Sequence, residues 1–298
     1  MTATPERSVF VGTSDFAAAV LDRLADSPYR PVLVVTRPDR PRGRGRRVAP
    51  PPVAEAARAL GIDLYQPTSV NDEEARARIA AANPDVVCVC AFGALIKEPL
   101  LSDYEMLNVH PSLLPRWRGA APIERAIMAG DAETGVSIMR LTAGLDSGPV
   151  CLQAREPIAA GDTYGTLSER LQSVGGELLV RALAERPPFR EQDEDGATYA
   201  QKLEPDDRRL DPSRPAAELE RVVRALTPHV GAYVELPDGG RLGVREAAVA
   251  PDGPPPGTLS LEGPRPVLGC ADSALELVVV QPPGRRAMPG EDYLRGLR

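Results

Sequence analysis

Short apolar segments alternate with longer helix-like segments through the first two-thirds of the chain, and this alternation limits the possible folds more than any other feature. The expected strands lie at 8–11, 31–36, 62–65, 85–91, 106–110, 135–141 and 150–156. The expected helices lie at 16–25, 53–60, 72–82, 121–129 and 163–184. Strands and helices that alternate at this spacing form a mostly parallel sheet with helices on both faces. We therefore predict an α/β fold, with ligands bound at the carboxyl ends of the strands.

The composition changes after Arg186. Two prolines lead into the charged stretch 191–196, which contains few apolar residues and is typical of a linker. Beyond it we expect a helix at 216–226, strand pairs at 232–236 with 241–249 and at 266–270 with 274–280, and a last helix at 290–297. Short paired strands of this kind are typical of a small β-barrel. We predict a first domain at 1–189, a linker at 190–206 and a second domain at 207–298.

The apolar pattern and the cysteines limit the cellular location and the cofactors. No run of about 18 apolar residues occurs, so we predict no membrane-spanning helix. The N-terminus lacks the basic and apolar regions of a secretion signal, so we expect a cytoplasmic protein, monomeric by default. Four cysteines are too few and too scattered for a disulfide scaffold. Cys88 and Cys90 occupy an apolar strand, which favours buried thiols, and we expect no metal.

The charge of the chain argues against a protein that coats nucleic acid. The formal net charge is −7, so any contact with nucleic acid needs a local basic patch. Lysine occurs only at positions 97 and 202, and every other basic residue is arginine. A cluster of arginines is therefore weaker evidence for nucleic-acid binding in this chain than in an average protein.

Three polar side chains point to a catalytic site. Asn108 and His110 are two residues apart on an expected strand, so their side chains share a face. Pro111 ends regular pairing there, and Asp146 follows a later strand in the glycine-bounded sequence Leu-Asp-Ser-Gly. One Asn, one His and one Asp are the minimum set for acyl transfer to an amine: an oxyanion donor, a proton carrier and a carboxylate that orients the carrier.

A structural interpretation of the same residues stays open. A lone histidine is usually structural, but the chain has only His110 and His229, and His110 has Asn108 and a proline-bounded loop beside it. We interpret His110 as functional and His229 as structural. Asp146 alone is ambiguous, because Asp-Ser-Gly is also ordinary turn chemistry.

The sequence Asn108-Val-His110-Pro-Ser-Leu-Leu-Pro115, followed downstream by Leu145-Asp146-Ser-Gly148, resembles the motif of enzymes that use formyl-tetrahydrofolate. The continuation Arg116-Trp-Arg-Gly-Ala-Ala-Pro-Ile123 resembles the methionyl-tRNA formyltransferase family in particular. The resemblance covers essentially the whole chain, in the same order. It includes Val11–Phe16, Arg37–Gly45, Ala91–Gly93, Ala197–Ala200, Gln281–Met288 and Asp292–Gly296. The fold that it implies is a Rossmann-like formyltransferase domain followed by a C-terminal OB-like domain.

The resemblance also implies substrates and roles. The co-substrate is 10-formyltetrahydrofolate, and the acceptor is the α-amino group of methionyl-initiator tRNA. Asn108 and His110 would hold the oxyanion, and Asp146 would orient His110. The residues implied for formyl-folate are Ala91, Phe92, Gly93, Ser112, Leu113, Leu114, Pro115 and Leu145. Phe16 would approach the methionyl side chain, although core packing is an alternative role for it.

An arginine-rich segment is the candidate tRNA contact. We predict that this segment is an exposed loop. Its one acidic residue is Asp39, and it contains six arginines: Arg37, Arg40, Arg42, Arg44, Arg46 and Arg47. Guanidinium groups bind phosphates well, but an arginine-biased chain also places them on ordinary solvated loops. The resemblance implies that the loop meets the acceptor stem, with Arg42 at the key position. His229-Val230 departs from the family pattern, which has Trp-Pro before Gly231.

Three other functional classes are alternatives to this interpretation. A formyl-folate transferase that acts on a small amine, such as an amino sugar nucleotide or glycinamide ribonucleotide, fits the three catalytic residues but needs neither the arginines nor a second domain. A nucleic-acid-binding protein without catalysis would have no need of Asn108, His110 and Asp146 together. A dinucleotide oxidoreductase is excluded, because no G-x-G-x-x-G follows Gly12.

Overall fold

The computed structural model describes residues 7–42, 47–236 and 238–297, with the side chains of Arg42 and Arg47 outside the description. The chain forms two compact units. Unit 1 consists of Met1–Ala120, Thr134–Glu156 and Ser168–Ala200, and unit 2 consists of Ala121–Glu133, Pro157–Leu167 and Gln201–Arg298. Both units contain segments from the first two-thirds of the chain. The predicted limits of the two domains and the linker remain predictions.

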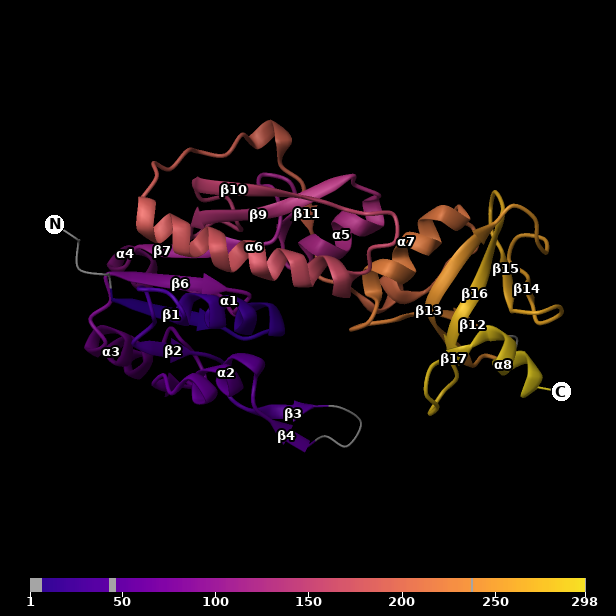
Figure 1. Ribbon diagram of the computed structural model, residues 1–298, viewed down its shortest axis with the longest axis horizontal. Helices are drawn as coiled ribbons and strands as arrows, with labels where there is room; N and C mark the ends of the chain where they lie inside the picture. Colours follow the sequence, from indigo (N-terminus) through magenta and orange to yellow (C-terminus); the bar gives the residue numbers. More distant parts are fainter. Residues whose placement is uncertain (1–6, 43–46, 237, 298) are drawn as a thin grey trace. The chain divides into compact units, whose positions relative to one another are not determined.

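Unit 1 is built on a seven-stranded sheet with the order β10-β9-β7-β6-β1-β2-β5 (Figure 1). Its strands are β1 (Ser8–Gly12), β2 (Leu33–Val35), β5 (Leu64–Tyr65), β6 (Val86–Cys90), β7 (Met106–His110), β9 (Glu133–Arg140) and β10 (Val150–Pro157). From β5 through β7 each strand is parallel to its neighbours, whereas β9 is antiparallel to β7. The predicted Rossmann-like, mostly parallel sheet is confirmed.

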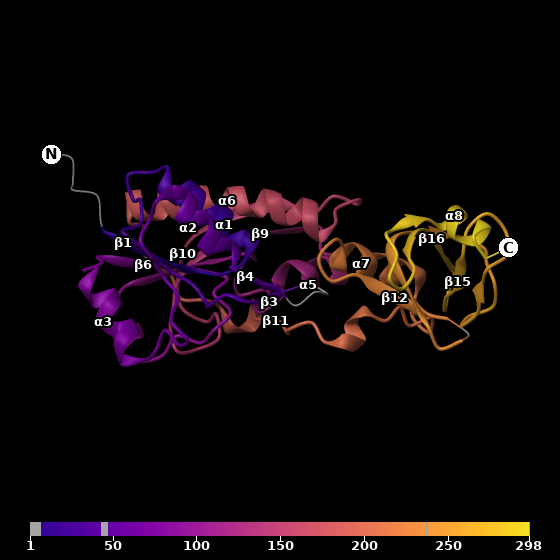
Figure 2. The ribbon, with the colours of Figure 1, turned by 90° about the horizontal axis from the view of Figure 1, so that it is seen from below.

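Helices cover both faces of this sheet. They are α1 (Asp15–Ala25), α2 (Pro52–Leu60), α3 (Glu73–Ala81), the short α4 (Leu100–Asp103), and α6 (Tyr164–Glu185), of which the part from Ser168 belongs to unit 1. Figure 2 shows α1, α2 and α6 along one face and α3 on the other. Side chains from α3 and α4 join alternate residues of β1, β2 and β6 in one buried apolar cluster. The layers explain why whole strands are apolar: both of their faces are covered.

Strands β1 and β6 lie at the centre, and all ten of their residues are buried. Cys88 and Cys90 are therefore buried free thiols, as predicted. At the end of β1, a Cβ on Gly12 would lie 2.8 Å from the carbonyl oxygen of Cys90 and 2.9 Å from the Cβ of Ala17. Glycine is required there because the strand and the following helix approach each other so closely.

Unit 2 contains α5 (Pro122–Ala129), α7 (Ala216–Leu226), α8 (Gly290–Arg295) and an antiparallel sheet with the order β12-β13-β16-β15-β14. The strands are β12 (Ala232–Glu235), β13 (Arg241–Ala250), β14 (Leu259–Ser260), β15 (Val267–Gly269), β16 (Ala274–Gln281) and β17 (Met288–Pro289), which pairs with β16. The β13–β16 register shifts on both sides of Glu246. Such irregularities increase the local twist and help a sheet to curl. The predicted strand pairs and OB-like architecture are confirmed.

Some elements differ from the sequence-based expectation. The arginine-rich segment contains two short strands, β3 (Arg40–Arg42) and β4 (Arg47–Ala49), which pair as an antiparallel hairpin, so a simple loop was wrong. Pro41 restricts the backbone to an extended conformation, and Val48 favours a strand. Residues 43–46, including Arg44 and Arg46, lie outside the described residues. Strands β8 (Arg118–Gly119) and β11 (Tyr199–Ala200) pair with each other and were also missed. Within the described ranges, no helix is long and apolar enough to span a membrane.

Candidate active site

Asn108 and His110 lie near and at the carboxyl end of β7, as predicted. In the register with β9, Asn108 is opposite Met139 and His110 is opposite Ser137. Both side chains are more than nine-tenths buried. The Asn108 carboxamide forms no hydrogen bond with any part of the chain that the structure describes. Because 8% of the surface of Asn108 is exposed at the strand end, its amide is available to a ligand.

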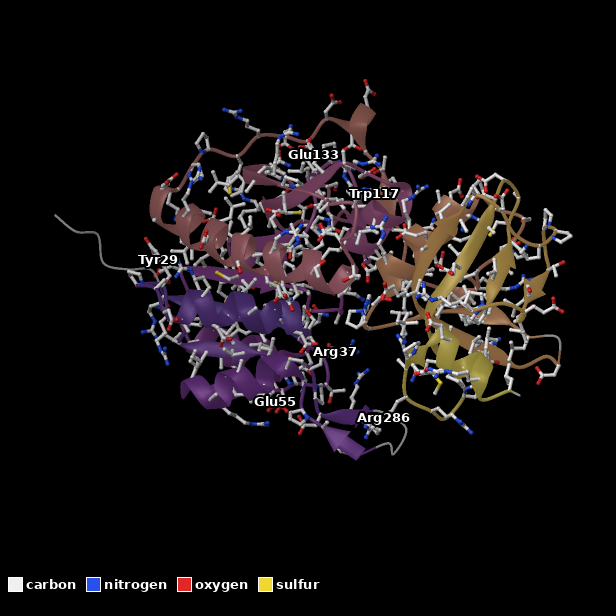
Figure 3. All side chains as sticks on the ribbon, turned by 45° about the vertical axis from the view of Figure 1, so that its right-hand side comes forward. Tyr29, Arg37, Glu55, Trp117, Glu133 and Arg286 are labelled. Carbon is white, nitrogen blue, oxygen red and sulfur yellow. The ribbon has the colours of Figure 1, made fainter. Side chains whose placement is uncertain are left out.

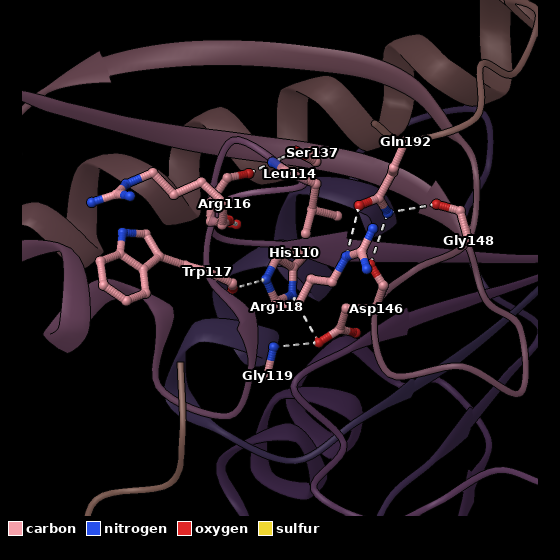
Figure 4. A network of polar contacts seen from close by, with 11 residues as sticks. His110, Leu114, Arg116, Trp117, Arg118, Gly119, Ser137, Asp146, Gly148 and Gln192 are labelled. Carbon is pink, nitrogen blue, oxygen red and sulfur yellow. Dashed lines mark hydrogen bonds and ion pairs between the residues drawn. The ribbon is translucent and has the colours of Figure 1, made fainter. Parts of the chain in front are cut away.

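The two ring nitrogens of His110 face different oxygen atoms (Figure 4). Nε2 lies 2.8 Å from the carbonyl oxygen of Trp117, and a carbonyl can only accept, so Nε2 carries the proton. Nδ1 lies 3.7 Å from Oδ2 of Asp146. That distance is too long for a hydrogen bond, but a small movement of either side chain would close it. His110 is thus oriented by a backbone carbonyl and faces a carboxylate.

Asp146 is held in its position by its backbone and by its side chain. Oδ2 accepts a hydrogen bond of 2.8 Å from the backbone N–H of Gly119. The residue has a φ of 46°, in the left-handed region that few residues other than glycine adopt. Only 14% of its side chain is exposed. This arrangement gives the carboxylate one direction, toward His110.

The segment after His110 forms a tightly bonded turn. The Ser112 hydroxyl donates to the carbonyl oxygen of Arg116 at 2.6 Å. The Ser137 hydroxyl accepts from the N–H of Leu114 at 3.0 Å, and Gln153 donates to the carbonyl oxygen of Leu114 at 2.8 Å. Ser112 and Leu114 are buried, so the Ser112 hydroxyl stabilises the turn itself. The backbone and the exposed edges of 112–115 are what a ligand would meet.

A second candidate folate segment follows β6, next to β7. Ala91 and Gly93 are exposed and have positive φ values of 41° and 70°, while Phe92 is buried in the apolar core. Thr13 donates to the carbonyl oxygen of Phe92, and Arg37 donates to that of Gly93. Leu145 is apolar and 62% exposed, directly before Asp146. These residues present small and apolar surfaces near the polar trio.

The arrangement supplies donors and a proton carrier for acyl transfer. The free amide of Asn108 and the ring of His110 are where an oxyanion would be stabilised, and Asp146 balances the charge of a protonated ring. No cluster of three or more His, Cys, Asp or Glu side chains that would hold a metal occurs within 7–42, 47–236 and 238–297.

Comparisons with known proteins agree with this chemistry. Residues 6–183 match the family model described as formyl transferase, and residues 202–298 match the one described as formyl transferase, C-terminal domain. A methionyl-tRNA formyltransferase of Dechloromonas aromatica is 42% identical over 97% of this chain and 95% of its own length. That of Halorhodospira halophila is 44% identical over 98% and 96%. An N-formyltransferase structure from Helicobacter canadensis, 14% identical, aligns with a TM-score of 0.67 over 91% of this chain and 98% of its own and supports the fold.

The chain belongs to the methionyl-tRNA formyltransferase family.

The structure of this methionyl-tRNA formyltransferase family member also describes Phe16 and two arginines of the arginine-rich segment. Phe16 is buried in the first turn of α1, with 5% of its surface exposed. Arg37, labelled in Figure 3, donates to the Gly93 carbonyl, so its guanidinium contacts the 91–93 segment. Arg40 is exposed on β3.

Sequence reasoning missed several residues that shape this candidate site. Gly119 holds Asp146, and the carbonyl of Trp117 holds His110. The sequence motif that contains Trp117 and Gly119 did not indicate these roles. Gln192 and Arg118 bond to each other beside Asp146, although Gln192 lies in the stretch that was interpreted as a linker. The contacts of Gly119, Gln192 and Arg118 join residues 27 to 74 positions apart, so no local pattern would have found them, whereas the Trp117 carbonyl lies only 7 residues from His110.

Proposed function

We propose that this chain transfers the formyl group of 10-formyltetrahydrofolate to the α-amino group of methionyl-initiator tRNA. The observation that carries the proposal is the meeting of Asn108, His110 and Asp146 at one end of β7 in a member of this family. The product, formylmethionyl-tRNA, would serve translation initiation.

The three side chains have distinct roles in the proposed reaction. An α-amine has a pKa of about 8, so a usable fraction is neutral and nucleophilic at neutral pH. As the amine adds to the formyl carbon, the formyl oxygen becomes negative, and the Asn108 amide and the positive charge of a protonated His110 ring stabilise it. Asp146 stabilises the protonated His110 ring. When the carbon–N10 bond breaks, N10 takes a proton and the amine has lost one, so the reaction balances.

The residues present fit a folate. The backbone at Ala91 and Gly93 adopts left-handed conformations, and neither residue has a side chain larger than a methyl group, which supports a folate site close to β7. The exposed apolar side chain of Leu145 stands beside the carboxylate of Asp146. We assign Ala91–Gly93, the turn Ser112–Pro115 and Leu145 to formyl-folate binding, with Phe16 lining the methionyl pocket.

The arginine-rich segment is assigned to the acceptor stem of the tRNA. The hairpin β3–β4 carries arginines on both strands, and Arg40 is exposed. The net charge of −7 makes such a local positive segment necessary for binding an RNA backbone. Arg37 fits less well, because its guanidinium already binds the Gly93 carbonyl.

The deciding experiment follows formyl-methionine after the protein is mixed with 10-formyltetrahydrofolate and radiolabelled methionyl-initiator tRNA. Asn108→Asp keeps the shape but places a negative charge beside the oxyanion, and we expect a loss in kcat of about 100- to 1000-fold. Asn83→Asp is the matched control, because it makes the same amide-to-carboxylate change at an exposed residue outside the site.

The alternative is a transferase with a small amine acceptor. Parallel reactions would contain an amino sugar nucleotide or glycinamide ribonucleotide in place of the tRNA. Consumption of formyl-folate with a small amine, and none with charged tRNA, would overturn the proposed acceptor.

A further inference from the structure

The side chain of Gln192 bridges the loop that carries Asp146. Its Nε2 donates to the carbonyl oxygen of Asp146 at 2.8 Å and to that of Gly148 at 2.7 Å. One carboxamide therefore closes the loop on both sides of Ser147 (Figure 4). Gln192 approaches from a segment more than 40 residues further along the chain.

Arg118 determines which end of the Gln192 amide faces the loop. Its Nε donates to Gln192 Oε1 at 3.0 Å. A guanidinium has donors only, so it selects the oxygen of the amide and leaves the NH₂ group for the two carbonyls. Arg118 is itself almost fully buried, with 2% of its surface exposed. The orientation of Gln192 is thus enforced by a side chain that has little room to move.

Arg118 is anchored from its other end by Glu194. Nη1 and Nη2 donate to the two carboxylate oxygens at 3.0 and 2.7 Å, a bidentate pair. Hydrogen bonding to Arg118 holds the pKa of Glu194 below its ordinary value, so the carboxylate stays charged through the neutral range. The backbone N–H of Arg118 also bonds to the carbonyl of Thr198 at 2.9 Å.

The conformation of Asp146 needs such support. Its φ of 46° lies in the left-handed region, which is unfavourable for a residue with a Cβ. The two bonds from Gln192 fix the peptide groups after Asp146 and Gly148, while the N–H of Gly119 fixes Oδ2. Without the Gln192 bonds, the loop would relax toward ordinary backbone angles, and the carboxylate would turn away from Nδ1 of His110.

We propose that Gln192, oriented by Arg118, is a positioning residue for formyl transfer: its carboxamide holds Asp146 in the strained conformation that directs the carboxylate at His110. The inference rests on the proposed function and adds a residue to it. Gln192 touches no reacting atom in this arrangement and acts only through Asp146.

Gln192→Glu separates positioning from folding. The new carboxylate keeps the size of the side chain and strengthens the contact with Arg118, but its second oxygen replaces the NH₂ group and faces the carbonyls of Asp146 and Gly148. We expect kcat to fall by about 10- to 100-fold, with little change in KM for either substrate, because a small misplacement of a catalytic group is costly. Gln172→Glu on α6 makes the same chemical change away from the site and should keep the original kcat and Tm.

A double-mutant cycle with Asp146→Asn tests whether Gln192 acts through Asp146. If it does, Gln192→Glu lowers kcat no further once Asp146→Asn is present. Losses that multiply would overturn the inference. Gln192→Met, which has similar length and no charge, repeats the cycle if the Glu variant does not fold, and it should lose kcat in the same non-multiplicative way.

The cycle also distinguishes this inference from the proposed function. If Asp146→Asn keeps full activity, the proposed role of Asp146 fails, and the role of Gln192 fails with it. If Asp146→Asn loses activity while both folded Gln192 variants keep theirs, only the positioning role is overturned.

Discussion

Nδ1 of His110 and Oδ2 of Asp146 face each other at 3.7 Å, although the strand before Asp146 runs away from His110. Strand β9 is antiparallel to β7 and ends with Arg140 opposite Leu107, at the far end of β7 from His110. The loop after β9 therefore returns along the sheet to bring the carboxylate back. The pair depends on that loop and on the contacts that hold it.

Asp146→Asn should lower kcat strongly and leave the fold intact. The amide oxygen still accepts from the Gly119 N–H, but the negative charge beside His110 is lost. We expect kcat to fall by about 100- to 1000-fold in the formylation assay. Asp103→Asn, at the exposed end of the short helix α4, is the matched control. The loss of one oxyanion donor lowers kcat far more than about threefold. If the kcat of Asp146→Asn stays within about threefold of that of the original protein, this result would argue against a role for the Asp146 charge.

Gly119→Ala should reduce both stability and activity. Gly119 has a φ of 118°, and a Cβ there would lie 2.7 Å from the carbonyl oxygen of Ala200. The strain should lower the free energy of unfolding by about 1–3 kcal/mol and displace the N–H that binds Asp146. Thermal unfolding and kcat together measure the effect. Gly161→Ala, where an added Cβ meets open space, should change neither.

Arg40→Ala should weaken tRNA binding and leave the folate site unaffected. If the hairpin contacts phosphates, KM for methionyl-tRNA rises, and the slope of log affinity against log salt becomes shallower by about 0.7–0.9 for each lost contact. Titration of binding against salt concentration measures this slope. Arg181→Ala, an exposed arginine of α6, is the control. An equal effect of both substitutions would indicate general charge attraction only.

Cys151 should react with thiol reagents before the other three cysteines. Burial raises the pKa of the Cys88 thiol to about 12 and that of the Cys270 thiol to about 11, and it raises the pKa of Cys90 still further. Cys151 is only half-buried. Titration with an aromatic disulfide at pH 8 should show one accessible thiol in the native protein and four in denaturant. Cys151→Ser should remove the native signal, and a remaining signal would contradict the assignment.

The Arg125–Asp207 pair should contribute stability that acid removes. Nη1 and Nη2 of Arg125 each lie 2.8 Å from an oxygen of the Asp207 carboxylate, and this hydrogen bonding lowers the Asp207 pKa from its usual value. A lowered folded-state pKa means that the unfolded chain binds a proton first as the pH falls. The contribution is therefore complete above the unfolded pKa of about 4 and is lost as the pH falls toward the folded pKa.

The test compares Tm against pH for the original protein and Arg125→Met. The difference between them should be largest above about pH 5 and should shrink as the pH falls through the carboxylate range. Arg181→Met, which breaks an exposed pair within α6, should change Tm little at any pH. A difference that does not vary with pH would show that packing, not charge, stabilises this contact.

The sequence by itself determined the layers of the fold and the strand that bears Asn108 and His110. The apolar runs at β1, β6 and β7 and the helical periodicity between them predicted a covered, mostly parallel sheet, because burial on both faces leaves that pattern in the residues themselves. The two-residue spacing of Asn108 and His110 likewise placed both side chains on one face, since alternation is a local property of a strand.

Only the tertiary structure decided how Asp146 is held. Gly119, Gln192 and Arg118 act on it from distant segments, through hydrogen bonds that leave no periodic pattern in the chain. The stretch that contains Gln192 reads as a charged linker because its apolar content is low, yet its polar side chains find partners inside unit 1. Local patterns record burial, whereas a directional bond between distant residues depends on coordinates that only the folded chain defines.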